Sequence, residues 1–184
     1  IKEDSPRAIR ELQAMGIKVV MLTGDNQRTA DAIGRQAGVD EVIAGVLPDG
    51  KEAVIRCLKE QGKVAMVGDG INDSPALSAA DVGIAINSGA AIAREIADVT
   101  IKADSLEELV VLKTIANSLQ RRVSANYRFV LTFNSALIAL GAMGILQPAS
   151  SAMLHNLSTI GISLKSMTNL IPEEKAQKAL AEKN

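Results

Sequence analysis

Short apolar runs alternate with longer amphipathic stretches along the first two thirds of the chain. The runs are rich in β-branched residues, as in IKVVML at residues 17–22, which is typical of strands covered on both faces of a parallel sheet. Between the runs, apolar residues recur at helical spacing, as at Ala53, Val54, Cys57 and Leu58. We therefore expect an α/β fold with a parallel sheet built from βαβ units. The expected strands lie at residues 17–22, 41–44, 64–67, 82–86 and 99–101, and the expected helices at 7–15, 26–37, 48–59, 72–80, 90–96 and 105–120.

The hydrophobic pattern changes after Arg122. Residues 129–146 and 148–164 carry no charged side chain, and each stretch is close to the roughly 20 apolar residues that a membrane-spanning helix needs. We expect a transmembrane α-helical hairpin within residues 124–171, with its turn at Gln147-Pro148. Basic residues flank the two outer ends and are absent from the turn, so both outer ends are expected to face the cytoplasm.

Three polar side chains weaken the hairpin as a membrane element. Asn134, His155 and Asn156 lower the hydropathy of the two stretches, so a buried helical hairpin in a soluble protein is the alternative. The tail at residues 172–184 is charged, and we expect it to be a short exposed helix or disordered. The chain is thus expected to hold a globular part at 1–123, the hairpin and the tail.

Composition excludes one class of partner and one kind of cross-link. The net charge is −1 and only 2% of the residues are aromatic. Such a chain offers neither the basic surface nor the stacking side chains of a nucleic-acid-binding protein, so no nucleic acid partner is expected. The single cysteine, Cys57, excludes an internal disulfide and is expected to be a small core residue.

The stretch KVAMVGDGINDSPAL, residues 63–77, is the main candidate for chemistry. Its apolar run leads to Gly68-Asp69-Gly70 at the carboxyl end of a strand, where ligand sites of open parallel sheets lie. Asp69, Asn72 and Asp73 then offer hard oxygen atoms of the kind that hold Mg²⁺ beside a phosphate. The pattern predicts phosphoryl chemistry. An ordinary strand-to-helix turn with solvated acids is the alternative.

Two motifs resemble those of a known family. GDGINDSPAL is similar to the hinge signature of the P-type ATPases, which are cation pumps with a haloacid dehalogenase-like phosphorylation domain, and MLTGDN at residues 21–26 resembles their second motif. Within that family the chain looks like the heavy-metal transporters. The resemblance reaches almost to Pro172, and it implies a Rossmann-type parallel sheet and an ATP-driven pump that works through an aspartyl-phosphate intermediate.

The resemblance also implies what lies outside this sequence. The family's nucleophile is the aspartate of an Asp-Lys-Thr-Gly-Thr motif, which does not occur here. We therefore expect the nucleophile, the actuator domain and the nucleotide-binding domain, which binds most of the ATP, to lie upstream. The chain would be the second half of the phosphorylation domain with the last two transmembrane helices, and we expect it to be inactive alone.

Roles for individual residues follow from the same resemblance. Thr23 would donate a hydrogen bond to a phosphoryl oxygen, Lys51 would neutralise charge on the acyl phosphate, and Asp69 with Asp73 would hold Mg²⁺. The implied catalytic set is Thr23, Gly24, Asp25, Lys51, Asp69, Asn72 and Asp73.

A polar stripe in the last apolar stretch is the candidate path of a transported metal. His155, Ser158, Thr159 and Ser163 share one helical face by their spacing, and we expect them to face Asn134. Neutral imidazole suits divalent transition metals, although these side chains could equally just hydrogen-bond neighbouring helices. The segment HNLST resembles the His-Glu-Gly-Ser/Thr-Thr pattern of the cobalt, zinc and iron branch, with Asn156 in place of the carboxylate.

The expected partners are therefore the remainder of the same pump and the lipid bilayer. The expected location is the cell membrane, with residues 1–123 and the tail in the cytoplasm. Two alternatives stay open from the sequence. One is a soluble phosphatase of the haloacid dehalogenase superfamily, and the other is a truncated, membrane-anchored metal-binding module.

Overall fold

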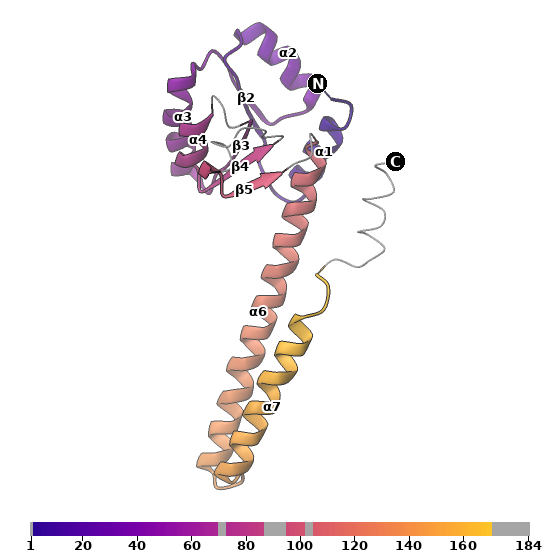
Figure 1. Ribbon diagram of the computed structural model, residues 1–184, viewed down its shortest axis with the longest axis vertical. Coiled ribbons are helices and arrows are strands. Elements are labelled where there is room, and N and C mark those ends of the chain that lie inside the picture. Colours follow the sequence, from indigo (N-terminus) through magenta and orange to yellow (C-terminus); the bar gives the residue numbers. More distant parts are fainter. Residues whose placement is uncertain (1, 70–72, 87–94, 102–104, 171–184) are drawn as a thin grey trace. The chain divides into compact units, whose positions relative to one another are not determined.

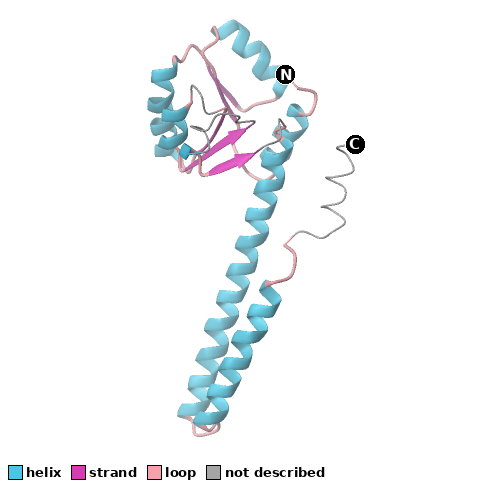
Figure 2. Cartoon of the chain, in the orientation of Figure 1, coloured by secondary structure: helices cyan, strands magenta, loops and turns pink. Residues whose placement is uncertain are grey.

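The computed structural model describes residues 2–69, 73–86, 95–101 and 105–170 (Figure 1). The chain divides into two compact units, Ile1–Val111 and Leu112–Asn184. Figure 2 shows where helices and strands lie along it. The strands of the first unit are β1 (Val20–Leu22), β2 (Glu41–Ile43), β3 (Ala65–Gly68), β4 (Val82–Ile86) and β5 (Val99–Ile101). Its helices are α1 (Ser5–Ala14), α2 (Gln27–Ala37), α3 (Pro48–Gln61) and α4 (Ser74–Ala79), and α6 (Glu107–Ala142) begins there.

The five described strands all pair in parallel. In a two-stranded sheet β1 pairs with β2, and in a three-stranded sheet β4 lies between β3 and β5. Parallel strands need a crossover connection, and α2 supplies it between β1 and β2 as α4 does between β3 and β4. The expected parallel α/β architecture is thus confirmed, although as two hydrogen-bonded sheets. The helix expected at residues 90–96 falls largely outside the described residues.

Local sequence signals set the helix boundaries. The side chain of Asn26 caps α2 by accepting from the backbone N–H of Thr29 at 3.0 Å, and Gly38 ends the helix in the left-handed region with φ of 79°. Pro48 begins α3, where its missing N–H has no helical partner to lose. Proline at the first helical position therefore begins the first turn of α3 directly after the loop that follows β2.

A small cluster of buried side chains forms the core beside β3. Ile55 of α3, Met66 of β3 and Leu77 of α4 pack together, and Leu22 of β1 packs against them. Helix α4 lies so close to β4 that a Cβ on Gly83 would come within 2.8 Å of the Leu77 carbonyl oxygen. The core therefore joins the segments from which the candidate site residues project.

The expected buried face of α3 was partly wrong. Cys57 is exposed rather than a core residue, and Ile55 is buried. Ile55 and Leu58 lie three residues apart and point toward the core, whereas Ala53 and Cys57 form the neighbouring outer face. Both faces carry apolar residues, so spacing alone did not distinguish them.

The second unit is a helical hairpin. Helix α6 continues without a break to Ala142, and α7 (Pro148–Ser166) returns beside it (Figure 1). Gly144 has φ of 73° in the connection, and Gln147 is the N-cap of α7, as the expected turn at Gln147-Pro148 predicted. The stretches expected as separate helices at 105–120 and 129–146 are therefore joined in α6.

Among the described residues, no helix is both long enough and apolar enough to cross a membrane. The membrane-spanning character expected for the hairpin is thus not confirmed. The physical reason lies in polar side chains inside the helices, such as Asn126, Arg128 and Asn134 in α6 and His155 and Asn156 in α7. The hairpin itself is present.

Candidate active site

The first part of the candidate site is the loop that follows β1. The Thr23 hydroxyl donates to Oδ2 of Asp25 at 3.0 Å, and the backbone N–H of Asp25 donates to the same hydroxyl oxygen at 3.2 Å. The Thr23 N–H donates to the Ile43 carbonyl at 3.0 Å, which ties the loop to β2. A hydroxyl has one proton to give, so Thr23 must release Asp25 before it can donate to another oxygen.

The Gly24 backbone lies close to the next loop. A Cβ at Gly24 would be 3.4 Å from the Val46 carbonyl oxygen, which is ordinary contact. The N–H of Gly45 donates to the Asp25 carbonyl at 2.8 Å, and the N–H of Val46 donates to the Thr23 carbonyl at 3.1 Å. These bonds hold the Thr23-Gly24-Asp25 loop against the segment that leads into α3.

The second part of the site is an ion pair between two helix starts. Lys51 lies in the first turn of α3, and Asp73 directly precedes α4. The Lys51 Nζ donates to Oδ1 of Asp73 at 2.6 Å, and the two side chains are only 17% and 14% exposed. Shielding from water strengthens this attraction relative to a surface pair. Lys51 is therefore held at the end of the sheet by a carboxylate.

The end of β3 touches the same carboxylate. A Cβ on Gly68 would come within 2.6 Å of Oδ2 of Asp73, so only glycine fits there without a shift of its neighbour. Asp69 follows directly after β3. Asp73 thus contacts both Lys51 and Gly68, and Asp69 directly follows Gly68 along the chain. Asn72 lies outside the described residues.

The two parts of the site are linked through the core. Leu22, which directly precedes Thr23, packs against the cluster that contains Met66 and Ile55. Met66 lies two residues before Gly68, and Ile55 lies four residues after Lys51. Packing of one cluster therefore fixes the segments that carry both candidate groups.

The carboxylates at the carboxyl end of β3 fit a magnesium ion. Over the described residues, no group of three or more His, Cys, Asp or Glu side chains is placed to hold a metal. Mg²⁺, however, is usually bound by one or two carboxylates with water and phosphate oxygens completing its shell. Asp69 and Asp73 provide such carboxylates, and Lys51 engages one oxygen of Asp73. The residues present therefore fit a magnesium ion shared with a phosphate.

The polar stripe of α7 meets α6 through one contact. His155 Nδ1 and Asn134 Oδ1 are 2.9 Å apart, so the expected facing of these two residues is observed. The hydroxyls of Ser158 and Thr159 donate to the His155 carbonyl at 2.7 and 3.1 Å, and that of Ser163 donates to the Thr159 carbonyl. The hydroxyls of these residues donate to backbone carbonyls of their own helix, a common arrangement for Ser and Thr.

A cavity of about 660 Å³ lies beside the His155–Asn134 contact. It is lined mainly by apolar atoms, with Ser151 and Asn156 among the polar residues at its wall. This cavity could not be predicted from the amino-acid sequence, because it depends on how α6 and α7 pack near their connection.

Comparison with known proteins places the chain in context. Residues 1–81 match the family model of haloacid dehalogenase-like hydrolases. Copper-transporting ATPase 1 of Rhizobium meliloti (strain 1021) is 46% identical over 155 residues, which make up 84% of this chain and 19% of that protein. Probable copper-exporting P-type ATPase V of Mycobacterium tuberculosis (strain CDC 1551 / Oshkosh) is 40% identical over 168 residues, or 91% of this chain and 22% of that protein. The chain is a relative of the heavy-metal P-type ATPases.

This P-type ATPase relative spans about a fifth of the length of the curated proteins it matches. Among solved structures, a zinc-transporting PIB-type ATPase in its E2.Pi state superimposes with a TM-score of 0.83 at 34% identity, covering 89% of this chain and 27% of that one. The names of these relatives specify copper in two cases and zinc in the third. The resemblance indicated by the two sequence motifs is therefore confirmed.

Proposed function

We propose that this chain is the C-terminal part of an ATP-driven pump for transition-metal cations. The contact of Lys51 with Asp73 at the end of β3 carries the proposal, because it draws the GDGINDSPAL and LPDGK segments together beside Asp69. The nucleophilic aspartate and most of the ATP site belong to parts of the pump outside this chain. Similarity to P-type ATPases over 84% and 91% of the chain favours a pump over a soluble phosphatase.

The residues of the chain would serve phosphoryl transfer by holding charge. Lys51 compensates negative charge on the phosphorylated aspartate, and Thr23 turns its hydroxyl from Asp25 to a phosphoryl oxygen. Asp69 and Asp73 would hold Mg²⁺, which when bound would supply the positive charge that lets carboxylates and a phosphate lie side by side. Each group is presented by a strand end or a helix start, so little rearrangement is needed.

The hairpin would provide the last two membrane helices of the pump. Many large apolar side chains of α6 and α7 are exposed, including Leu131, Ile138, Leu157 and Leu164. An apolar surface of this extent is typical of a face covered by lipid or by other helices. The superposition on the zinc-transporting ATPase covers 89% of the chain, whereas residues 1–123 make up about two thirds of it, so the match includes part of the hairpin. We therefore place the pump in the cell membrane, with residues 1–123 and the tail in the cytoplasm.

The transported cation would pass along the polar face of α7. His155 and Asn134 meet across the hairpin, with Ser158 and Thr159 one turn further along. In the tautomer that carries its hydrogen on Nδ1, His155 donates a hydrogen bond to the Asn134 oxygen, which leaves the unprotonated Nε2 of the neutral imidazole available as a metal ligand. The cargo on this proposal is a divalent transition metal.

The decisive experiment is Asp69→Asn in the intact pump. Replacing the carboxylate by an amide keeps its size and removes the charge that binds Mg²⁺, so formation of the phosphoenzyme from ATP or its turnover should be lost. Radiolabelled phosphate on the pump and steady-state ATP hydrolysis measure the two steps. Glu60→Gln, an exposed carboxylate of α3, is the matched control and should behave as wild type. Wild-type turnover by the Asp69 variant would overturn the assignment.

A further inference from the structure

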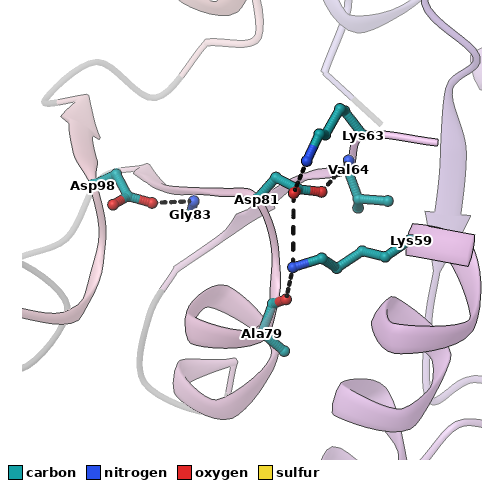
Figure 3. Close-up of polar contacts among 7 residues, drawn as sticks. All are labelled: Lys59, Lys63, Val64, Ala79, Asp81, Gly83 and Asp98. Carbon is teal, nitrogen blue, oxygen red and sulfur yellow. Dashed lines mark hydrogen bonds and ion pairs between the residues drawn. The ribbon is translucent and has the colours of Figure 1, made fainter.

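An aspartate directly precedes the second strand of each parallel pair that the structure describes. Asp40 precedes β2, Asp81 precedes β4 and Asp98 precedes β5. The carboxylate of each accepts from a backbone N–H near the start of the partner strand. The donors are Val19 at 2.7 Å for Asp40, Val64 at 3.0 Å for Asp81 and Gly83 at 2.8 Å for Asp98. Figure 3 shows the bonds of Asp81 and Asp98.

The three bonds occupy the same position in the strand register. The first paired residues are Val20 with Glu41, Ala65 with Val82, and Ile84 with Val99. One residue earlier in each pair, the aspartate lies opposite the very residue whose N–H it binds. The carboxylate therefore adds one rung to the beginning of each ladder.

In two of the pairs the hydrogen bonding is reciprocal, since the aspartate also donates its backbone N–H to the residue that binds its carboxylate. The N–H of Asp40 donates to the Val19 carbonyl at 2.9 Å, and the N–H of Asp81 donates to the Val64 carbonyl at 2.9 Å. In a parallel ladder the backbone bonds of one residue go to two different partner residues. Here the side chain supplies the missing acceptor, so the N–H and the carbonyl of Val19 both bind Asp40, and those of Val64 both bind Asp81, although the Val64 carbonyl also accepts from Val82 at 3.2 Å.

This device acts on strands that are too short to fix their own register. β1, β2 and β5 have three residues each and β3 has four. A slip by one residue moves a strand by about 3.3 Å and turns every side chain to the opposite face. Such a slip would displace Thr23 at the end of β1 and Asp69 at the end of β3.

We propose that Asp40, Asp81 and Asp98 are register-setting residues, which position the candidate site from the opposite ends of the strands. They precede the amino ends of β2, β4 and β5, and they act through the strands that carry Thr23 and Asp69. The proposal concerns folding of the first unit, so it holds whether or not the chain belongs to a pump.

The hydrogen bond, rather than the neighbouring lysines, is the functional part of the device. Lys63 contacts Asp81 at 2.9 Å but is 92% exposed, and Lys59 is 3.8 Å away and also donates to the Ala79 carbonyl (Figure 3). Ion pairs as open as that of Lys63 contribute little to stability. The Val64 N–H, with help from Lys63, holds the pKa of Asp81 below its ordinary value. The Val19 N–H, with Gln13 and Lys18 nearby, does the same for the pKa of Asp40.

A pH titration of the full chain tests the proposal without any mutation. Amide proton shifts of Val19 and Val64, followed by NMR, should change with a midpoint below the ordinary aspartate pKa of about 3.9, because their acceptors lose the negative charge there. The amide of Ala85, within β4, serves as an internal reference. The proposal would be overturned if the amide protons of Val19 and Val64 shifted with pH no more than that of Ala85.

Substitutions at Asp81 separate the bond from the charge. Asp81→Asn keeps an acceptor oxygen, so it should preserve the slow exchange of the Val64 amide and the shift of the Asp69 amide. Asp81→Ala removes the acceptor and should speed exchange at Val64 about tenfold while shifting Asp69. Lys63→Met should resemble wild type. The role of Asp81 would be refuted if Lys63→Met and Asp81→Ala changed Val64 amide exchange equally, or if Asp81→Ala left this exchange unchanged. If the alanine variant does not fold, Asp81→Asn and the pH titration decide.

Discussion

Gly68→Ala is the sharpest test of how the end of β3 is built. The new Cβ would lie 2.6 Å from Oδ2 of Asp73, about 0.8 Å short of the 3.4 Å at which ordinary contact begins. Gly68 is not among the described glycines with positive φ, so its backbone accepts alanine. The effect of the substitution therefore comes from the collision with Asp73, which can relax only by moving this carboxylate or the strand.

The size of the stability loss follows from the Lys51–Asp73 contact, which the new methyl group would disturb. The Lys51–Asp73 pair is 2.6 Å long and mostly shielded from water. Exposed ion pairs contribute up to about 1 kcal/mol, and breaking a buried pair costs about 3–5 kcal/mol, so this partly buried pair lies between them at about 2 kcal/mol. Shifting the strand instead is overpacking, which costs about 1–3 kcal/mol. Either route predicts a loss of about 2 kcal/mol in the free energy of unfolding.

Urea unfolding of the chain measures this loss against a matched control. Gly62 precedes the same strand in extended backbone, and a Cβ there meets nothing within 4 Å. Gly62→Ala should therefore be neutral or stabilising by about 0.4–1 kcal/mol. In a Lys51→Met background the ion pair is already gone, so Gly68→Ala should cost clearly less. The reasoning fails if the two glycine variants are equally stable, or if the effects of Gly68→Ala and Lys51→Met simply add.

Two predictions concern the hairpin. Arg122 donates to the carbonyls of Ser166, Thr168 and Asn169 at 3.2, 2.5 and 2.9 Å. Because lysine lacks the planar fork of arginine, Arg122→Lys should speed amide exchange in the last turn of α7. Equal exchange rates in Arg122→Lys and in the control Arg121→Lys would contradict this prediction. In the intact pump, His155→Ala should abolish metal stimulation of ATP hydrolysis while phosphorylation by inorganic phosphate persists. Unchanged metal stimulation, as expected of the control Ser150→Ala, would reduce His155 to a helix-packing residue.

The parallel fold could be predicted because buried strands and their crossover helices leave different periodicities in the sequence. The joining of α6 could not, since the change of composition after Arg122 suggested a boundary. Residues 121–128 contain neither glycine nor proline, and a helix continues through a change of polarity when nothing breaks it. Hydrophobic pattern reports what surrounds a helix, whereas breakers and caps report where it ends.

The motifs predict the residues of the candidate site, but the contacts among these residues could not be read from the motifs. Lys51 and Asp73 are both marked by the family resemblance, yet nothing in the sequence pairs them across 22 residues. The aspartates that begin the strand pairs were missed for a related reason. A single aspartate before a strand is a common turn residue, and its partner becomes visible only once the strand register is known.

The same residue types serve opposite ends of β3, and burial distinguishes their roles. The chain contains two Gly-Lys pairs, Gly50-Lys51 and Gly62-Lys63, and each lysine contacts an aspartate. At the amino end Lys63 is 92% exposed, so water screens its charge and the carboxylate of Asp81 works mainly through a backbone bond. At the carboxyl end Lys51 is 17% exposed, and its charge acts at much lower screening on any group that enters beside Asp73. On the proposed function, a phosphoryl group would find a concentrated positive charge at the carboxyl end, beside Lys51, while the aspartate at the amino end would keep the strand in register.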